Sequence, residues 1–431
     1  MTEKEGRPIL LIMSISLGVL VLVFLGIALR QLFRIPLKIW QIMGIGAAIV
    51  LFTGRITVLS AWMAIDWDII YFLFGMFYVG TALEESGYIH KFVSRYLLEG
   101  CSQKTLALVI VFGMGIFSAL LMNDTLAIIG TPLLIKVAQH RKIEARPLLL
   151  GLAFAITIGS VMSPIGNPQN LLIALEVPIE SPFLTFLKYL GIPTLINLVI
   201  LYFFLLYLMK NNRQDHPEIE SVVPYNKKLM ILSKIALGMV VVMIGYNILA
   251  SFLSLPSIPL PGIALIPAIF LMIFAPKRKE IFSLLDWHTL VFFIAMFILM
   301  QSVWETSSVK EVLLNPGPFM KSIPGVMMVS TFASQLISNV PLVALYLPTI
   351  KQLGGDYPIY MALAAGSTIA GNFLIFGAAS NLIIVQNAEK KRETGVTFSS
   401  FAKFGIPLTI INILIYWLFL AHVVGSLAKA N

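Results

Sequence analysis

Long apolar stretches alternate with short polar or basic segments along nearly the whole chain. A helix needs about 20 predominantly apolar residues to cross a bilayer, so this pattern predicts an all-α polytopic membrane protein. Six apolar elements precede a polar connector at residues 210–228, and six elements of the same kind follow it. The expected elements span residues 8–29, 39–54, 68–84, 105–135, 147–177, 187–209, 229–250, 261–275, 288–303, 324–350, 357–388 and 404–425.

Two elements in each half depart from a simple span. Residues 105–135 and 324–350 are each too long for one crossing and too short for two, and polar residues lie at their centres. Irregular backbone at membrane depth is tolerated only against protein or a water-filled cavity, so we expect two re-entrant hairpins. Residues 147–177 and 357–388 carry Gly and Asn clusters at midspan, which predicts broken helices.

The two halves share landmarks in the same order. Met122–Asp124 aligns with Ser338–Val340, 216 residues later, and Gly166–Asn170 aligns with Gly377–Asn381, 211 residues later. Such an ordered set of polar, Gly and Pro landmarks indicates an internal duplication. The predicted organisation is a first repeat at residues 1–209, a connector at residues 210–228 and a second repeat at residues 229–431.

Each repeat then has five crossings and one hairpin, which gives ten spans in all. An odd number of crossings inverts the second repeat relative to the first. With both termini outside, 22 of the 30 Lys and Arg residues fall in cytoplasmic loops, as the positive-inside rule requires. We therefore expect a protein of the cell (inner) membrane with both termini external and a cytoplasmic connector. The first hairpin would open from the cytoplasm and the second from outside.

Composition supports the membrane class. Hydrophobic residues make up 58% of the chain, charged residues only 12%, and the mean hydropathy is +0.91. A soluble globular domain carries about 25% charged residues. The net charge of +9 comes from short basic clusters between apolar segments, so we expect no nucleic-acid partner. The single cysteine, Cys101, excludes a disulfide framework and a multi-thiolate metal site.

One carboxylate, Asp124, lies at the centre of the first predicted hairpin. An Asp in the middle of a membrane costs roughly 2.5 to 3.5 kcal/mol on the insertion scale, so its presence indicates a functional role. Val340 occupies the aligned position, so only the first half carries the charge. We therefore hypothesise that the first half binds the coupling cation, H⁺ or Na⁺. The candidate cation-binding residues are Asn123, Asp124, Thr125, Gly166 and Asn167.

The hairpin tips and helix breaks also suit an anion or a neutral oxyacid. Helices that begin at membrane depth point the positive ends of their dipoles at the break, and unwound backbone exposes hydrogen-bonding groups. One site can therefore hold both a cation and a substrate. No cofactor is expected beyond H⁺ or Na⁺ as the coupling ion. The candidate substrate-binding residues are Asn123, Asn167, Gln169, Asn170, Ser338, Asn339, Gly377, Ser380 and Asn381.

Several motifs resemble the ion transporter superfamily, which holds the arsenite permeases, the D-type sodium/proton antiporters and the sodium-coupled dicarboxylate symporters. They are Asn-Asp-x-x-x-x-Ile-x-Thr-Pro at 123–132, Gly-Asn-Pro-Gln-Asn at 166–170, Ser-Asn-x-Pro at 338–341 and the duplicated hairpins. The resemblance covers nearly the full length. It implies a homodimer with a scaffold domain, and a transport domain of hairpins and broken helices that moves like an elevator.

The resemblance is uneven between branches of the superfamily. Dicarboxylate symporters carry Ser-Asn-Thr at both tips, whereas these tips read Met122-Asn123-Asp124 and Ser338-Asn339-Val340. The Asn-Asp pair is closer to the arsenite permeases and antiporters, although arsenite permeases lack the motif at 166–170. The leading hypothesis is a secondary active carrier of a small inorganic or organic anion or metalloid oxyacid, with arsenite or antimonite efflux first.

Two other transport functions stay open: Na⁺/H⁺ antiport, in which Asp124 would serve both ions, and sodium-coupled dicarboxylate or anion symport. A channel would be expected to show a continuous ring of pore-lining groups. An enzyme is not expected, because no Gly-x-Ser-x-Gly elbow or nucleophile–base pair stands out. No cytoplasmic segment is long enough to bind nucleotide, so ATP coupling would require a separate subunit. The expected partners are the substrate, the lipid bilayer and a second copy of the chain.

Overall fold

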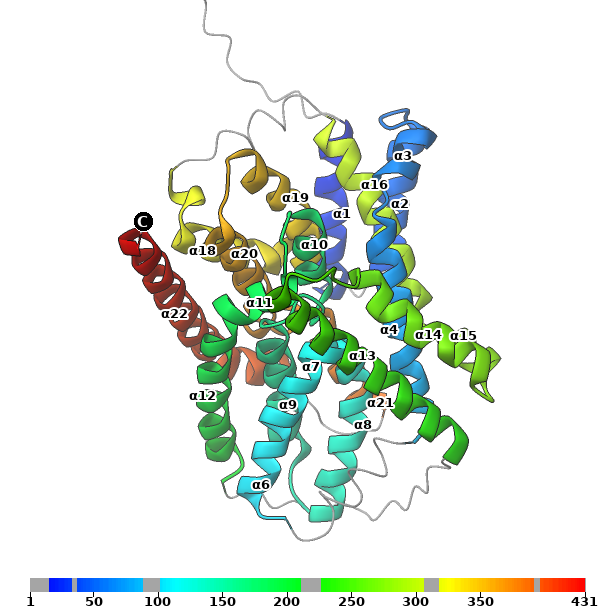
Figure 1. Ribbon diagram of the computed structural model, residues 1–431, viewed down its shortest axis with the longest axis vertical. Coiled ribbons are helices and arrows are strands. Elements are labelled where there is room, and N and C mark those ends of the chain that lie inside the picture. The colour runs from blue at the N-terminus through cyan, green and yellow to red at the C-terminus, as the bar shows by residue number, and fades with distance from the viewer. Residues whose placement is uncertain are drawn as a thin grey trace, which may run out of the picture. The chain divides into compact units, whose positions relative to one another are not determined.

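The computed structural model describes residues 15–32, 37–87, 101–210, 226–305, 318–390 and 396–430 (Figure 1). Every regular element in these ranges is a helix, as expected. Five helices are long and apolar enough to cross a membrane, or six if α3 (Val58–Ala64) and α4 (Trp67–Glu85) count as one bent span. The ten spans and the inverted repeat therefore stay predictions. The expected connector lies almost entirely outside the described residues.

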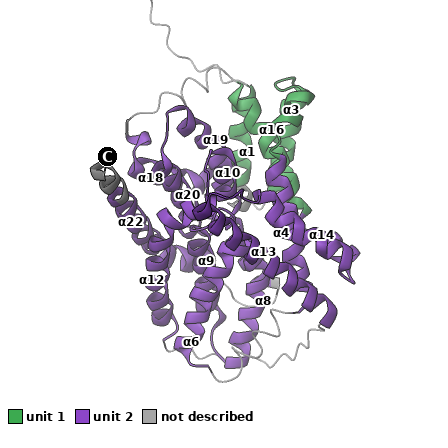
Figure 2. Cartoon of the chain, viewed as in Figure 1, with its two compact units in different colours: residues 1–66, 287–317 green, residues 67–286, 318–431 purple. Residues whose placement is uncertain are grey.

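The chain forms two compact units, which Figure 2 colours separately. Unit 1 comprises residues 1–66 and 287–317, and unit 2 comprises residues 67–286 and 318–431. Each unit therefore combines segments from both halves of the sequence. In unit 1, α16 packs against the three other helices. The further elements of unit 1 are α1 (Ile15–Leu32), α2 (Ile39–Phe52) and α16 (Trp287–Trp304).

The first hairpin of unit 2 begins with one continuous helix made of α6 (Gln103–Leu108), the π-helical η2 (Val109–Met114) and α7 (Gly115–Leu121). The chain then reverses, and α8 (Asn123–Arg141) returns. At the open end, the Arg141 guanidinium donates a hydrogen bond of 2.8 Å to the carbonyl oxygen of Cys101. The two ends of this segment therefore meet, as in any helical hairpin. Its first arm is one of the five helices long enough to cross a membrane, so re-entry stays a prediction.

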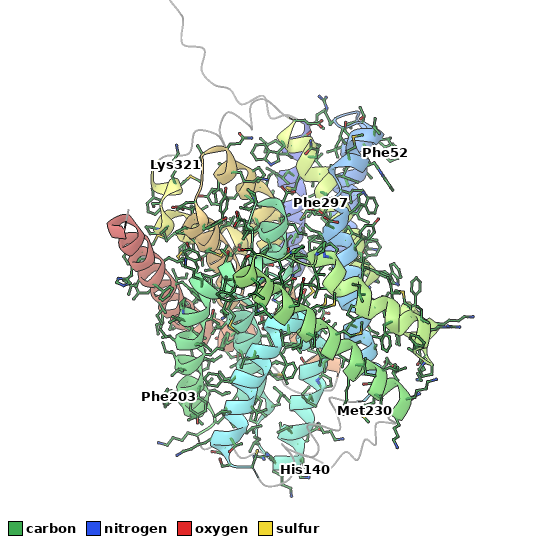
Figure 3. All side chains as sticks on the ribbon, viewed as in Figure 1. Phe52, His140, Phe203, Met230, Phe297 and Lys321 are labelled. Carbon is green, nitrogen blue, oxygen red and sulfur yellow. The ribbon has the colours of Figure 1, made fainter. Side chains whose placement is uncertain are left out.

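The second hairpin consists of α18 (Ile323–Ile337) and α19 (Asn339–Gln352), which follow η4 (Pro318–Lys321). The Tyr346 hydroxyl donates a hydrogen bond of 2.6 Å to the carbonyl oxygen of Met320, which closes its open end. In Figure 3, His140 near the end of α8 and Lys321 just before α18 lie at opposite ends of unit 2. The two hairpins thus enter the unit from opposite ends.

Two helices of unit 2 are interrupted at the expected places. The first consists of α9 (Ala145–Ser160) and α10 (Pro168–Glu176). The second runs from α20 (Tyr357–Ile369) through the short 3₁₀ turns η5 (Ala370–Asn372) and η6 (Ile375–Gly377) to α21 (Ala379–Lys390). The second helix of each hairpin packs against the interrupted helix of the other half of the sequence. Thus α8 packs against α21, and α19 packs against α10.

Each hairpin also meets the interrupted helix of its own half at main-chain distance. A Cβ atom at Gly159 of α9 would overlap the carbonyl oxygen of Gly115 in α7. A Cβ at Gly366 of α20 would lie 2.9 Å from the carbonyl oxygen of Met327 in α18. Small residues at these crossings let the backbones approach closely.

Besides α4 and η4, the described part of unit 2 contains seven further helices outside the hairpins and interrupted helices. They are α11 (Pro182–Phe186), η3 (Leu187–Gly191), α12 (Ile192–Leu208), α13 (Lys227–Leu253), α14 (Leu260–Phe274), α15 (Arg278–Ser283) and α22 (Phe398–Ala430).

Candidate substrate and cation site

The first hairpin tip docks on the first helix break. Met122 reverses the chain in a left-handed backbone conformation (φ +70°), and α8 begins at the next residue. The backbone N–H of Asn123 donates a hydrogen bond of 3.0 Å to the carbonyl oxygen of Gly166. Asn123 and Thr125 are buried and Asp124 is half-buried. No ion pair of the described residues involves Asp124, and the Asn123 Oδ1 atom accepts no hydrogen bond within them.

Two asparagines organise the first break. Asn167 caps α10, because its Oδ1 accepts a hydrogen bond of 2.9 Å from the backbone N–H of Asn170, and Pro168 occupies the first helical position. Asn170 Nδ2 donates to three carbonyl oxygens of the unwound segment at 3.0 to 3.3 Å. A Cβ at Gly166 would overlap the carbonyl oxygen of Ser160, so no larger residue fits there. The amide side chains thus replace hydrogen bonds that the broken helix lost.

Thr368, at the end of α20, joins this break to the second half of the chain. Its hydroxyl accepts hydrogen bonds from Asn167 Nδ2 at 3.2 Å and Gln169 Nε2 at 3.4 Å, and it donates to Asn170 Oδ1 at 3.2 Å. Thr368 is not among the residues predicted for the site. The signal was present, since Thr157 precedes it by 211 residues, the spacing that also separates the two breaks.

The second hairpin tip contacts the second break in a related way. Ser338 reverses the chain with φ +69°, and α19 begins at Asn339, which is buried. Gln335, one turn before the tip, donates a hydrogen bond of 2.8 Å from Nε2 to the carbonyl oxygen of Ala370. In the described part of the chain, Gln335 Oε1 and Asn339 Oδ1 accept no hydrogen bond. Gln335 is a second residue that the sequence analysis did not name.

Fewer of the polar side-chain atoms at the second break have hydrogen-bond partners than at the first. Asn381 Nδ2 donates a hydrogen bond of 2.6 Å to the carbonyl oxygen of Gly371, much as Asn170 does in the first break. Gly377 and Ser380 are buried beside it. Among the described residues, Ser380 Oγ and Asn381 Oδ1 lack hydrogen-bond partners. Oxygen atoms without a hydrogen-bond partner therefore concentrate at the second break, whereas the side-chain amides of Asn167 and Asn170 form hydrogen bonds within the protein.

Four helices begin at the tips and breaks: α8, α10, α19 and α21. The first N–H groups of a helix have no partner within it and carry partial positive charge. Asp124 is the one candidate residue with a formal charge. The arrangement can therefore attract an anion to helix N-termini and hydroxyls, and a cation to a carboxylate and amide oxygens.

Ser338→Gly is expected to stabilise the protein. A non-glycine residue in this sparsely populated backbone region costs about 1 to 3 kcal/mol, which glycine relieves. Thermal unfolding in detergent should show a higher midpoint than the wild type. Ser330→Gly, at an ordinary helical position of the same hairpin, should lower the midpoint because glycine costs about 1 kcal/mol there. Equal losses in both variants would contradict the assignment of strain to the tip.

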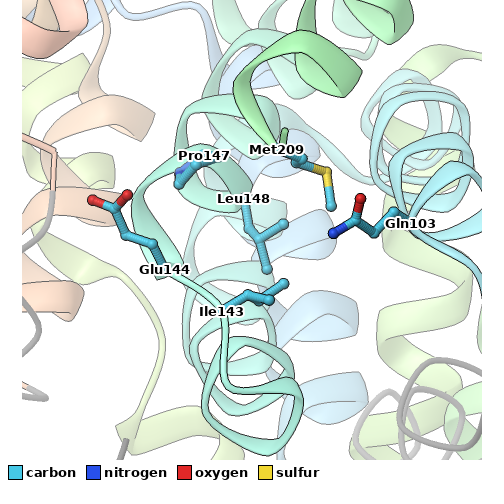
Figure 4. A pocket seen from close by; sticks show the side chains of 6 residues that line it. All are labelled: Gln103, Ile143, Glu144, Pro147, Leu148 and Met209. Atoms are coloured by element: carbon cyan, nitrogen blue, oxygen red, sulfur yellow. The ribbon is translucent and has the colours of Figure 1, made fainter. Parts of the chain in front are cut away.

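A separate pocket lies at the open end of the first hairpin, away from the candidate residues (Figure 4). It is lined by Gln103, Ile143, Glu144, Pro147, Leu148 and Met209. Because none of the tip or break residues reaches it, we do not include it in the site.

A solved structure resembles this fold. The YdaH transporter of Alcanivorax borkumensis superimposes with a TM-score of 0.53 over 83% of this chain and 85% of that chain, at 14% sequence identity. At that identity the likeness concerns the fold alone.

Sequence relatives include proteins named as a membrane protein and as a transporter. A 46 kDa membrane protein of Mycobacterium leprae is 27% identical over 83% of this chain and 86% of its own length. An uncharacterized transporter of Synechocystis sp. is 22% identical over 88% and 91%, respectively. The human P protein is 23% identical over 84% of this chain and 54% of its own length.

The names of the first two relatives fit the transport role in a membrane that the superfamily resemblance implies. A family model described as a citrate transporter, CitMHS, matches residues 45–358, which include both hairpins and the first break. The chain therefore belongs to the citrate transporter (CitMHS) family.

Proposed function

We propose that the protein is a cation-coupled secondary transporter of a small carboxylate, with citrate as the first substrate to test. The observation that carries this proposal is the docking of each hairpin tip on a helix break, around one carboxylate and several unpartnered amide oxygens. The description of the family favours a carboxylate. Arsenite or antimonite, which the Asn-Asp motif suggested first, gains no such support and becomes the second substrate to test.

The charge of Asp124 gives a physical reason for coupling. Two like charges about 8 Å apart repel by about 2 kcal/mol at an effective dielectric constant of 20. A bound carboxylate and an ionised Asp124 would therefore oppose each other, and a proton or Na⁺ on Asp124 removes the repulsion. Substrate and cation then bind best together, which is the requirement for symport.

The proposed organisation is two inverted repeats with ten spans, two hairpins and both termini external. One support is the entry of the hairpins from opposite ends of unit 2 (Figure 1). The other is the matched pair of hydrogen bonds that Asn170 and Asn381 donate in the two breaks. Alternating access of the elevator type and a homodimer complete the proposal, as the superfamily resemblance implies.

Na⁺/H⁺ antiport is the second candidate. The half-buried Asp124, with no cationic partner among the described residues, could bind either ion in competition. In that case the protein would exchange Na⁺ for H⁺ without a carboxylate substrate.

Reconstitution of the purified protein in proteoliposomes tests the proposal. Labelled citrate should be taken up saturably and accumulate when an inward H⁺ or Na⁺ gradient is imposed, and collapse of the gradient should abolish accumulation. Parallel vesicles would measure arsenite flux and Na⁺-dependent proton release without citrate. Citrate-independent Na⁺/H⁺ exchange would favour the antiporter, and arsenite flux without citrate uptake would overturn the carboxylate assignment.

A further inference from the structure

A second group of polar residues lies buried between α12 and α22, outside the candidate site. These helices pack side by side in unit 2 (Figure 1). The group consists of Thr194 and Asn197 on α12 and Thr409, Asn412 and Tyr416 on α22, and every one of these side chains is fully buried, at 0% exposure. We call this group the polar seam.

Direct hydrogen bonds tie only part of the polar seam together. The hydroxyls of Thr194 and Tyr416 lie 2.6 Å apart, and Asn412 Nδ2 donates to Asn197 Oδ1 at 2.8 Å. Among the described residues, three atoms of the polar seam have no partner with hydrogen-bond geometry: Asn197 Nδ2, Asn412 Oδ1 and Thr409 Oγ1. The Asn197 side chain also lies close to the Tyr416 hydroxyl. A hydroxyl and an unpaired donor and acceptor are thus buried within a membrane protein, where such groups are normally satisfied.

The leftover donor and acceptor do not depend on how the amides are oriented. If both asparagines are turned over, Asn197 donates to Asn412, and the pair still leaves the NH₂ group of one amide and the oxygen of the other without a partner. Turning over only one would place two donors or two acceptors against each other. Any ligand of the polar seam must therefore accept from one amide and donate to the other.

The polar seam also adjoins the second helix break. Gly405, Thr409, Asn412 and Tyr416 are spaced i, i+4, i+7 and i+11, so they share one face of α22. A Cβ at Gly405 would overlap the carbonyl oxygen of Asn372, in the unwound segment of the break. Thr409 therefore lies one turn from the candidate site, on the face of α22 that meets it.

We propose that the polar seam is a buried water site, in which one water molecule bridges Asn197, Asn412 and Thr409. The water accepts from Asn197 Nδ2, donates to Asn412 Oδ1 and exchanges a hydrogen bond with the Thr409 hydroxyl. Three hydrogen bonds are typical of a buried water. A metal cation could not use the amide N–H, and an anion could not use the amide oxygen, so water is the ligand that fits all three atoms.

Thr409→Val tests the proposal by the direction in which the midpoint of thermal unfolding changes. Valine has nearly the shape of threonine but lacks the hydroxyl. A bridging water loses one partner in this variant, so the midpoint of thermal unfolding should fall by roughly 1 to 2 °C. In a dry polar seam the same change removes an unpaired hydroxyl and should raise the midpoint. A rise would overturn the proposal.

Two controls accompany this measurement. Thr409→Ser keeps the hydroxyl and should retain the water, whereas Thr131→Val removes a buried hydroxyl that bonds only the carbonyl oxygen of Ala127 in its own helix. A structure of the wild type at a resolution that shows ordered waters should contain a density peak about 2.7 to 3.2 Å from all three atoms. Clear density for waters elsewhere and none in the polar seam would also overturn the proposal. Neither readout depends on the transport function.

Discussion

Asp124→Asn is expected to abolish the accumulation of substrate driven by a cation gradient. Asparagine has the shape of aspartate but can neither take up a proton nor offer a negative charge to Na⁺. Gradient-driven uptake in proteoliposomes should fall about 100-fold, which corresponds to about 2.7 kcal/mol of lost coupling. Exchange of labelled for unlabelled substrate without a gradient should fall less, because the hairpin tips and breaks are intact.

Glu144→Gln is the matched control, since it also neutralises one carboxylate. Glu144 lies in the loop before α9 and pairs with Arg146, outside the candidate site. Its uptake should equal that of the wild type. If Asp124→Asn kept concentrative uptake with unchanged dependence on pH and Na⁺, Asp124 would not be the coupling residue.

Gly166→Ala is expected to have the second large effect, on both stability and transport. The added Cβ overlaps the carbonyl oxygen of Ser160, so the unwound segment must shift. The Gly166 carbonyl oxygen accepts a hydrogen bond of 3.0 Å from the backbone N–H of Asn123. The shift would pull these two groups apart. Overpacking of this kind costs about 1 to 3 kcal/mol. We expect a lower midpoint of thermal unfolding and at least a 10-fold loss of uptake, or about 1.4 kcal/mol.

Gly238→Ala controls for the substitution itself. Gly238 lies within α13, and a Cβ there would meet no atom within 4 Å. This variant should be slightly more stable than the wild type, because alanine favours a helix over glycine by roughly 0.5 to 1 kcal/mol. Wild-type uptake and stability in Gly166→Ala would show that the first break tolerates a side chain and does not hold the tip.

Much of the fold could be predicted from local patterns in the sequence. Apolar stretches gave the helices, and their interruption at Asn123 and at Ser338 marked the points where the chain reverses. Glycine, proline and asparagine marked both breaks, since each removes or replaces a helix hydrogen bond. The all-helical class and the membership of the transporter superfamily were therefore predictable. The count of ten spans stays a prediction, because several apolar helices, α2 and α14 as well as the interrupted α9, are shorter than the length that a crossing requires.

The roles of the candidate residues were harder to predict. Asn167 and Asn170 stay predicted substrate ligands, and the structure adds a role that the sequence did not show: their amides bond the main chain and Thr368. Thr368 itself lies in an ordinary apolar helix about 200 residues away, so no local pattern marks it. Gln335 lies one turn before the second tip, but its partner, the carbonyl oxygen of Ala370, belongs to a different helix. Which residues become hydrogen-bond partners across such separations depends on how the helices pack. The sequence of a single helix does not show this.

The main-chain contacts between the hairpins and the interrupted helices limit how the protein can move. At Gly115 and Gly159, and again at Gly366, no layer of side chains separates the two backbones. A flap-like swing of one hairpin would have to pull these backbones apart and expose polar groups at membrane depth, which is costly. We therefore expect each hairpin and its interrupted helix to move as one piece. A binding site built between them would then be carried whole, and its opening would depend on where the hinges of that piece lie.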